Sequence, residues 1–221
     1  MSQVESMSVT TERQMDVAFD GEITSTIIQS EIDTIAKPFK ANVDVVVIRN
    51  GEVAQRYGTY AVENGEDIDT YSEMEGKWVH EAGTMADISQ YNIWMQKDLF
   101  LNHLSFFIVD GTEEINGVSA TVVTGILDGK DMADSGEEWA DIREGKVDVD
   151  ASIKLWITED GYILRHEIDA TALMNGMRSG ADPEAEPVDD WSYGAYVEQM
   201  TYGDFNTVPD FEIPAEVLDA A

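Results

Sequence analysis

Apolar and polar residues alternate one by one along much of this chain. In residues 7–19 the odd positions include Met7, Val9 and Met15, whereas the even positions from Ser8 to Asp16 are polar. The clearest run is 147–157, where Val, Ala, Ile and Leu occupy every second position. Because successive side chains of a strand point to opposite faces of a sheet, this period predicts strands buried on one face. The pattern therefore predicts a mainly β fold.

Glycine-containing pairs separate the alternating runs. Asn-Gly and Asp-Gly adopt the positive φ angles that tight hairpins require, so each pair predicts two neighbouring antiparallel strands. No repeat of fixed length and no boundary between domains is evident, and we predict one domain over residues 1–221. The pairs are Asp20-Gly21, Asn50-Gly51, Asn64-Gly65, Glu75-Gly76, Asn116-Gly117 and Asp160-Gly161.

Four segments depart from simple alternation. Residues 43–48 are continuously apolar apart from Asp44, which predicts a central strand buried on both faces. Residues 84–103 carry apolar side chains at steps of three and four, the period of a helix. A weaker helix is predicted over 128–145. The loop 178–190 is rich in acidic residues, Gly and Pro, and we predict that it is exposed and mobile.

The charge of the chain excludes some partners. Its 221 residues contain 13 Lys and Arg against 45 Asp and Glu, a formal net charge of -32. Nucleic-acid binding depends on cations that neutralise phosphates, so no nucleic-acid partner is expected. The same charge opposes docking on an anionic membrane. We interpret the charge as a source of solubility.

No catalytic or metal centre is predicted. The three histidines lie outside any ligand motif, there is no cysteine, and no nucleotide-binding loop occurs. Residues 128–134 space carboxylates loosely, but they lack the Gly and the Glu of a calcium loop. We therefore expect no cofactor, no dedicated metal and no enzymatic activity. A hydrolase with two converging carboxylates is kept as an alternative.

The large apolar side chains of the chain allow two interpretations. Met15, Phe19, Trp94 and Met95 are large and adaptable side chains that could line a ligand cavity. Close packing of a protein's own side chains is the ordinary outcome, so a filled core is the other interpretation. The sequence pattern alone does not separate the two.

Four segments resemble one known superfamily. The hairpin 153–169, with Trp156, Ile157, Gly161 and Ile163, is similar to the "W-I-D-x-x-G-x-I-x-K" hairpin of LolA/LppX-like lipoprotein domains, with Thr158 and Arg165 as departures. The tail 202–217 resembles their C-terminal ending. The segments 60–65 and 75–78 look like hairpins of uncharacterised Gram-positive lipoproteins of that superfamily.

The resemblance implies a curved antiparallel half-barrel of about eleven strands, α+β in class, with helices covering the concave face. Such proteins carry lipoproteins or glycolipids in an apolar cavity. It also implies an extracytoplasmic, membrane-anchored lipoprotein, although residues 1–5 show no signal peptide and no lipobox cysteine is present. The partner is then a lipid or another amphipathic molecule, and the membrane is contacted only through an N-terminal lipid anchor.

Eight apolar residues are predicted to line that cavity: Met15, Val17, Phe19, Trp94, Met95, Leu99, Ile153 and Leu155. The alternative function is a non-enzymatic cell-envelope module that binds proteins and has a self-filled core.

Overall fold

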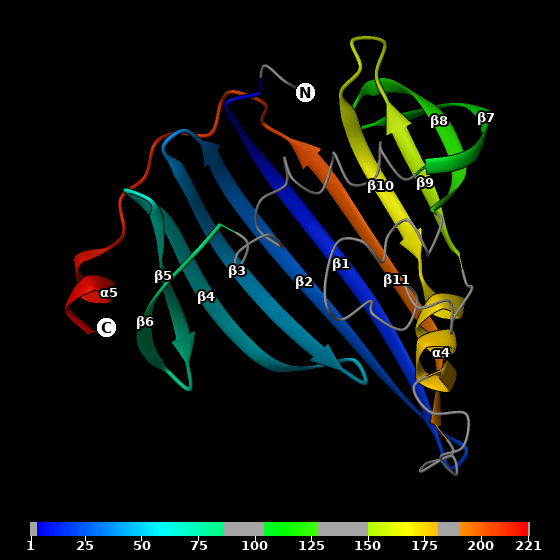
Figure 1. Cartoon of the computed structure of the whole chain (residues 1–221), viewed down its shortest axis with the longest axis horizontal. Coiled ribbons are helices and arrows are strands. Elements are labelled where there is room, and N and C mark those ends of the chain that lie inside the picture. The colour runs from blue at the N-terminus through cyan, green and yellow to red at the C-terminus, as the bar shows by residue number, and fades with distance from the viewer. Residues whose placement is uncertain (1–3, 86–103, 128–149, 181–190, 221) are drawn as a thin grey trace.

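The computed structural model describes residues 4–85, 104–127, 150–180 and 191–220. One antiparallel sheet of eleven strands dominates it, and two short helices accompany the sheet (Figure 1). The strands are β1 (Ser6–Phe19), β2 (Glu22–Ala36), β3 (Phe39–Arg49), β4 (Glu52–Asn64), β5 (Asp67–Met74), β6 (Lys77–Gly83), β7 (Leu104–Ile115), β8 (Val118–Leu127), β9 (Ala151–Ile157), β10 (Ile163–Asp169) and β11 (Trp191–Gly203); the helices are α4 (Thr171–Gly180) and α5 (Ala215–Ala220).

The strand order is β6-β5-β4-β3-β2-β1-β11-β10-β9-β8-β7. Two meanders, β1–β6 and β7–β10, thus lie side by side, and the last strand, β11, joins them by pairing with β1 on one side and β10 on the other. The sheet is open, with β6 and β7 as its edges. The predicted curved antiparallel half-barrel is confirmed.

The hairpins form where the glycine pairs predict them. Asp20, Asn50, Glu75 and Asn116 have φ angles between 48° and 53°, and the glycine after each is also at positive φ. Two successive left-handed residues give the type I′ turn, whose twist matches that of the flanking strands. Local sequence therefore sets most strand boundaries.

Strand β3 corrects one prediction. Phe39, Ala41, Val43 and Val45 are buried, but Asp44 on the other side of the strand is exposed. The strand is central in the sheet and buried on one face only. Its continuous apolar run indicated two covered faces because Val46 and Ile48 are apolar, yet both are only half-buried.

The predicted helices 84–103 and 128–145 lie outside the described residues, apart from positions 84–85. Helix α4, in contrast, was missed. It begins after Asp169, whose carboxylate accepts a hydrogen bond from the Thr171 backbone N–H at 2.9 Å, an Asx-type turn that leads into the helix. Residues 178–180 of the predicted loop belong to α4, and the rest of that loop is outside the described ranges. No helix within the described ranges is long and apolar enough to cross a bilayer.

Candidate functional site

The apolar core lies on one face of the sheet, which we call the inner face. Cross-strand pairing aligns Tyr202, Val9, Ile32 and Val43 in one row on this face. All four are at most 5% exposed. We call this region the closed half of the inner face; it comprises Met7, Val9, Ile32, Ala41, Val43, Ala61, Leu155, His166 and Tyr202.

The same face continues toward the β1–β2 turn, where its side chains are only half-buried. Strand alternation places Arg13, Met15 and Val17 on the face of Met7 and Val9. Ile28 and Val47 lie in the row of Arg13, and Tyr57 lies one row away, opposite Val45. We call this region the open half; it comprises Arg13, Met15, Val17, Ile28, Val47 and Tyr57.

The predicted lining residues divide between these regions. Met15 and Val17 are in the open half, opposite Tyr196 and Tyr193 of β11. Phe19 ends the strand and is 52% exposed. Ile153 and Leu155 are each 1% exposed and belong to the inner-face core cluster. Trp94, Met95 and Leu99 lie outside the described residues.

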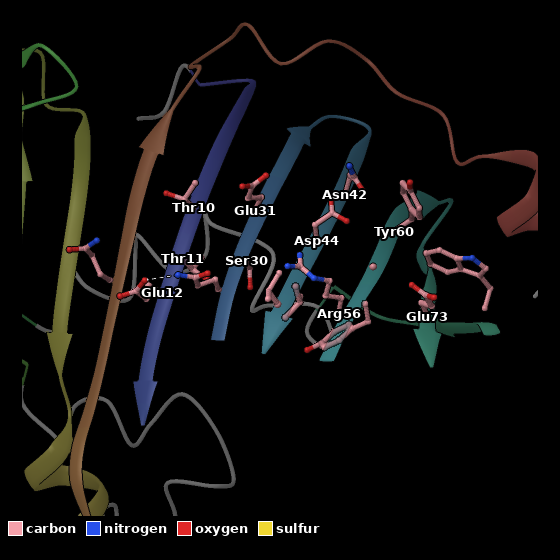
Figure 2. A pocket seen from close by; sticks show the side chains of 17 residues that line it. Thr10, Thr11, Glu12, Ser30, Glu31, Asn42, Asp44, Arg56, Tyr60 and Glu73 are labelled. Atoms are coloured by element: carbon pink, nitrogen blue, oxygen red, sulfur yellow. Dashed lines mark hydrogen bonds between the residues drawn. The ribbon is translucent and has the colours of Figure 1, made fainter. Parts of the chain in front are cut away.

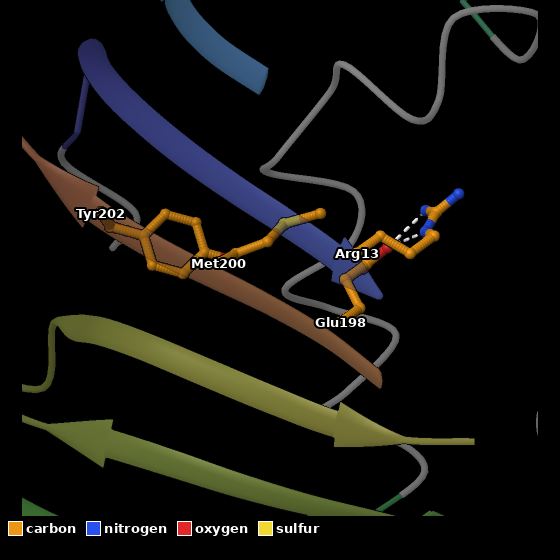
Figure 3. Close-up of polar contacts among 4 residues, drawn as sticks. All are labelled: Arg13, Glu198, Met200 and Tyr202. Atoms are coloured by element: carbon orange, nitrogen blue, oxygen red, sulfur yellow. Dashed lines mark hydrogen bonds and ion pairs between the residues drawn. The ribbon is translucent and has the colours of Figure 1, made fainter. Parts of the chain in front are cut away.

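An ion pair interrupts the apolar wall of the open half. Arg13 and Glu198 are opposite one another on β1 and β11, and Arg13 donates from Nε to Glu198 Oε2 at 2.7 Å and from Nη2 to the same oxygen (Figure 3). Burial alone would lower the pKa of Arg13, but Glu198, with Tyr196 and Tyr57, outweighs it and raises that pKa. Both residues occupy positions that the alternation assigns to the apolar face. A charged residue at such a position was the one sequence feature that could have indicated this ion pair.

A hollow of about 580 Å³ adjoins the open half. Tyr57 borders it, together with inner-face side chains of β5 and β6 such as Thr70, Ser72 and Val79. Tyr57 thus borders both the open half and the hollow. The hollow itself is largely polar, because Gln55 and the carboxylates of Glu73, Glu75 and Glu81 line it as well.

Helix α4 is attached to β11 beside the open half. Asn175 donates from Nδ2 to the Tyr193 carbonyl and accepts from the Tyr193 N–H at Oδ1, each at 2.8 Å. Thr171 Oγ1 accepts from the Tyr196 N–H at 2.8 Å. Strand β10 pairs with β11 only as far as Val197. Beyond that point the side chains of Asn175 and Thr171 make the hydrogen bonds to the β11 backbone that a neighbouring strand would otherwise make. The anchoring therefore holds in place the part of β11 that faces Met15 and Val17.

The closed half contains one buried polar pair. His166 is fully buried, and its Nδ1 lies 2.8 Å from the hydroxyl of Tyr202, which is also buried. Burial lowers the pKa of His166 to about 3 and raises that of the Tyr202 hydroxyl. The imidazole is thus neutral at physiological pH.

A second hollow, of about 1240 Å³, lies at the end of the sheet next to the closed half. Val4, Phe39 and Met85 line it, and so does the C-terminal tail. Lys40 fastens that tail, because its Nζ contacts Asp210 Oδ1 at 2.5 Å and the Phe211 carbonyl at 3.0 Å. In Figure 1 the tail runs along the strand ends from β11 to α5.

The opposite, outer face carries a polar groove of about 700 Å³ (Figure 2). Glu31, Asp44 and Glu73 line it, with Arg56 as the cation. Trp78 lies over Gly58, where a Cβ atom would come within 3.3 Å of the indole ring. The two faces of β1–β5 therefore differ: the inner one is mainly apolar and the outer one is mainly polar.

The structure offers little support for the hydrolase alternative. Asp69, Glu113 and Asp210 have lowered pKa values because they accept hydrogen bonds from His80, Trp156 and Lys40, respectively. A catalytic carboxylic acid needs the opposite shift. Within the described part of the chain, no three His, Asp or Glu residues converge as metal ligands.

Two solved structures share this fold. Lipoprotein LppX of Mycobacterium tuberculosis matches with a TM-score of 0.52 and 17% identity, over 96% of this chain and 91% of LppX. LprF from Mycobacterium bovis matches with a TM-score of 0.50 and 15% identity, over 96% of this chain and 90% of LprF. No known family profile and no curated protein sequence matches. The predicted LolA/LppX-like resemblance is confirmed at the level of the fold.

Proposed function

We propose that this protein binds the apolar part of a lipid or another amphipathic molecule on the inner face of its sheet. The observation that carries the proposal is the open half. There Met15, Val17, Ile28 and Val47 are only half-buried, although they continue an apolar wall that is completely buried a few residues away. Partly exposed apolar surface that adjoins a hollow is a preferred place for an apolar ligand.

Affinity would come from removing apolar surface from water. Each buried methylene group contributes roughly 0.8 kcal/mol, so one acyl chain suffices for measurable binding. The acyl chain would contact Met15, Val17 and Phe19 of the predicted lining, and Ile153 and Leu155 would form the wall beside them. Trp94, Met95 and Leu99 would complete the lining.

The proposal includes an extracytoplasmic location and an N-terminal lipid anchor. The fold shared with lipoprotein LppX supports both. The strongly acidic surface is consistent with attachment through an acyl chain, because the protein surface would not by itself adhere to anionic lipid.

A reciprocal pair of variants tests the binding surface. Met15→Gln makes the inner face polar with little change in volume, and Gln14→Met makes the opposite substitution one residue away on the outer face. In a titration with the methyl ester of a fluorescent fatty acid, Met15→Gln should weaken binding roughly tenfold, as expected when apolar contact of a side chain is lost. Gln14→Met should bind like wild type.

Equal effects of the two substitutions would contradict the proposed surface. An independent check is mass spectrometry of organic extracts of the purified protein, which should reveal a co-purified amphiphile. Absence of both a bound lipid and any saturable titration would refute lipid binding altogether.

A protein-binding role is the second candidate, and edge strand β7 favours it. Phe106, Phe107, Ile108 and Val109 follow one another and are each 63–85% exposed. An exposed apolar edge strand is a surface on which another strand can pair. Phe107→Lys should then abolish a complex with an envelope protein without altering lipid titration, and an unchanged complex would exclude this edge.

A further inference from the structure

The Arg13–Glu198 pair lies where the sheet should be apolar. The successive cross-strand partners in the row that contains this pair, from β9 to β3, are Ile153, Ile168, Glu198, Arg13, Ile28 and Val47. Both direct neighbours of the pair in this row, Ile168 and Ile28, are thus isoleucines. The pair is the one charged cross-strand contact in this row of the described sheet, and it lies between a fully buried region and a half-buried one.

The geometry leaves much of the guanidinium free. An arginine has five N–H donors, and here two of them converge on one oxygen, Glu198 Oε2. Three donors remain, and within the described ranges no further hydrogen bond joins them. The Arg13 side chain is 41% exposed and that of Glu198 only 17%. The carboxylate is thus the more covered of the two groups, and the arginine is the one with more exposed surface.

Stability alone is a weak reason for this pair. Ion pairs withdrawn from water gain little over apolar side chains of similar volume, because desolvation offsets the attraction. An apolar pair would also extend the surrounding wall without interruption. A hydrogen-bond acceptor brought in by a ligand, in contrast, would meet charge-assisted donors that are already oriented.

The charge distribution narrows the class of ligand. Glu198 already neutralises Arg13, so an anionic head would place a second negative charge against the same guanidinium. The overall charge of -32 adds to that repulsion, although salt screens it beyond about 8 Å. An uncharged acceptor, such as an ester or another carbonyl group, accepts the remaining donors without this cost.

We propose that Arg13 binds the uncharged, carbonyl-bearing polar group of an amphipathic ligand, and that Glu198 is the positioning residue that makes the site reject anions. This inference rests on the proposed function, since the acyl chain would occupy the open half beside Arg13. It assigns an orientation to the bound ligand: the polar group of the ligand lies at the ion pair, and its acyl chain lies over Met15 and Val17.

The test compares two polar head groups, a methyl ester and a carboxylate, on the same acyl chain. Methyl laurate and laurate compete with a neutral fluorescent probe, N-phenyl-1-naphthylamine, for the full-length protein. Wild type should bind the ester at least tenfold more tightly than laurate. Arg13→Met should remove roughly tenfold of the ester affinity, which corresponds to the loss of one hydrogen bond to a charged group. Glu198→Gln should raise laurate affinity roughly tenfold and leave the ester nearly unchanged.

The double variant Arg13→Met/Glu198→Leu separates binding from folding. It replaces the pair with apolar side chains, so it should fold normally, take up the probe and show no preference between the heads. If a single variant unfolds in a thermal melt, the test relies on the double variant and on Arg13→Lys. The lysine retains the positive charge but lacks the paired N–H donors of the guanidinium.

The outcomes distinguish the two proposals. Failure of wild type to bind the probe or either competitor refutes the proposed function itself. Normal uptake by wild type with equal affinity for both heads, or with a preference that Arg13→Met and the double variant both retain, refutes the role of Arg13 alone. A laurate affinity unchanged in Glu198→Gln refutes the role of Glu198.

Discussion

The closed and open halves of the inner face belong to the same strands, yet they differ in burial. Val9 and Arg13 are four residues apart on β1, and one is 1% exposed whereas the other has a side chain that is 41% exposed. Strand geometry alone treats the two positions alike. The difference shows that alternation selects a face of the sheet, whereas the surrounding tertiary structure decides how far each part of that face is covered.

The halves also differ in their polar groups. In the closed half, His166 and Tyr202 hydrogen-bond to each other and both are completely buried. In the open half, Arg13 uses only part of its donor capacity. A buried polar pair that bonds to itself indicates a structural role, whereas unused donors on a partly exposed side chain beside an apolar surface indicate a role in binding.

The largest expected contrast between the halves is in stability. Leu155→Ala removes a fully buried side chain of the core and should lower the free energy of unfolding by about 3 kcal/mol. Val17→Ala, in the half-buried region, should lower it by less than about 1 kcal/mol. Urea unfolding followed by tryptophan fluorescence measures both. Similar losses would show that the open half is packed as tightly as the closed half.

The second contrast is in pH dependence. The pKa of His166 is about 3 in the folded protein and 6.5 ordinarily, so between these values the unfolded chain binds a proton that the folded chain does not. Stability should therefore fall as the pH drops below about 6.5, by roughly 2 kcal/mol at about pH 5. The loss should be complete near pH 3 and absent above pH 7.

The control for this contrast is His166→Gln. Protonation of the many carboxylates also changes stability, and the difference between wild type and this variant cancels their contribution. Urea midpoints at several pH values supply that difference. A difference independent of pH would mean that the imidazole is accessible to protons, and the burial assigned to the closed half would be wrong.

The smallest effect concerns the far end of the open half. Phe19 is 52% exposed, so Phe19→Ser should change the free energy of unfolding by less than about 0.5 kcal/mol. If an acyl chain extends as far as Phe19, the same substitution should weaken titration with long chains about threefold and leave short chains unaffected. An equal effect on all chain lengths would place the chain elsewhere.

Much of the fold could be predicted because it depends on local chemistry. The type I′ turns at Asn50-Gly51 and Asn116-Gly117 require φ angles that few residues other than Asn, Asp and Gly adopt easily. Those pairs marked the hairpins correctly. Helix α4 was missed because its anchors, Asn175 and Thr171, act on the backbone of β11, which is distant in sequence.

The candidate site could be predicted only in part. Met15 and Val17 were identified because they are in phase with the apolar face of β1. Arg13 has the same phase but was not considered, since a charge at an apolar position has no meaning until its partner is known. That partner, Glu198, is 185 residues away and becomes its neighbour only through the pairing of β1 with β11.

By itself, the sequence determined which residues form strands, where the hairpins turn and which side of each strand is apolar. These properties follow from backbone sterics and from the two-residue period of a strand, and they need no distant contact. Only the tertiary structure decided that the last strand inserts beside the first and brings Glu198 against Arg13. It also decided that β3 is covered on one face only, because burial depends on which segments pack over a strand and not on the strand's own residues.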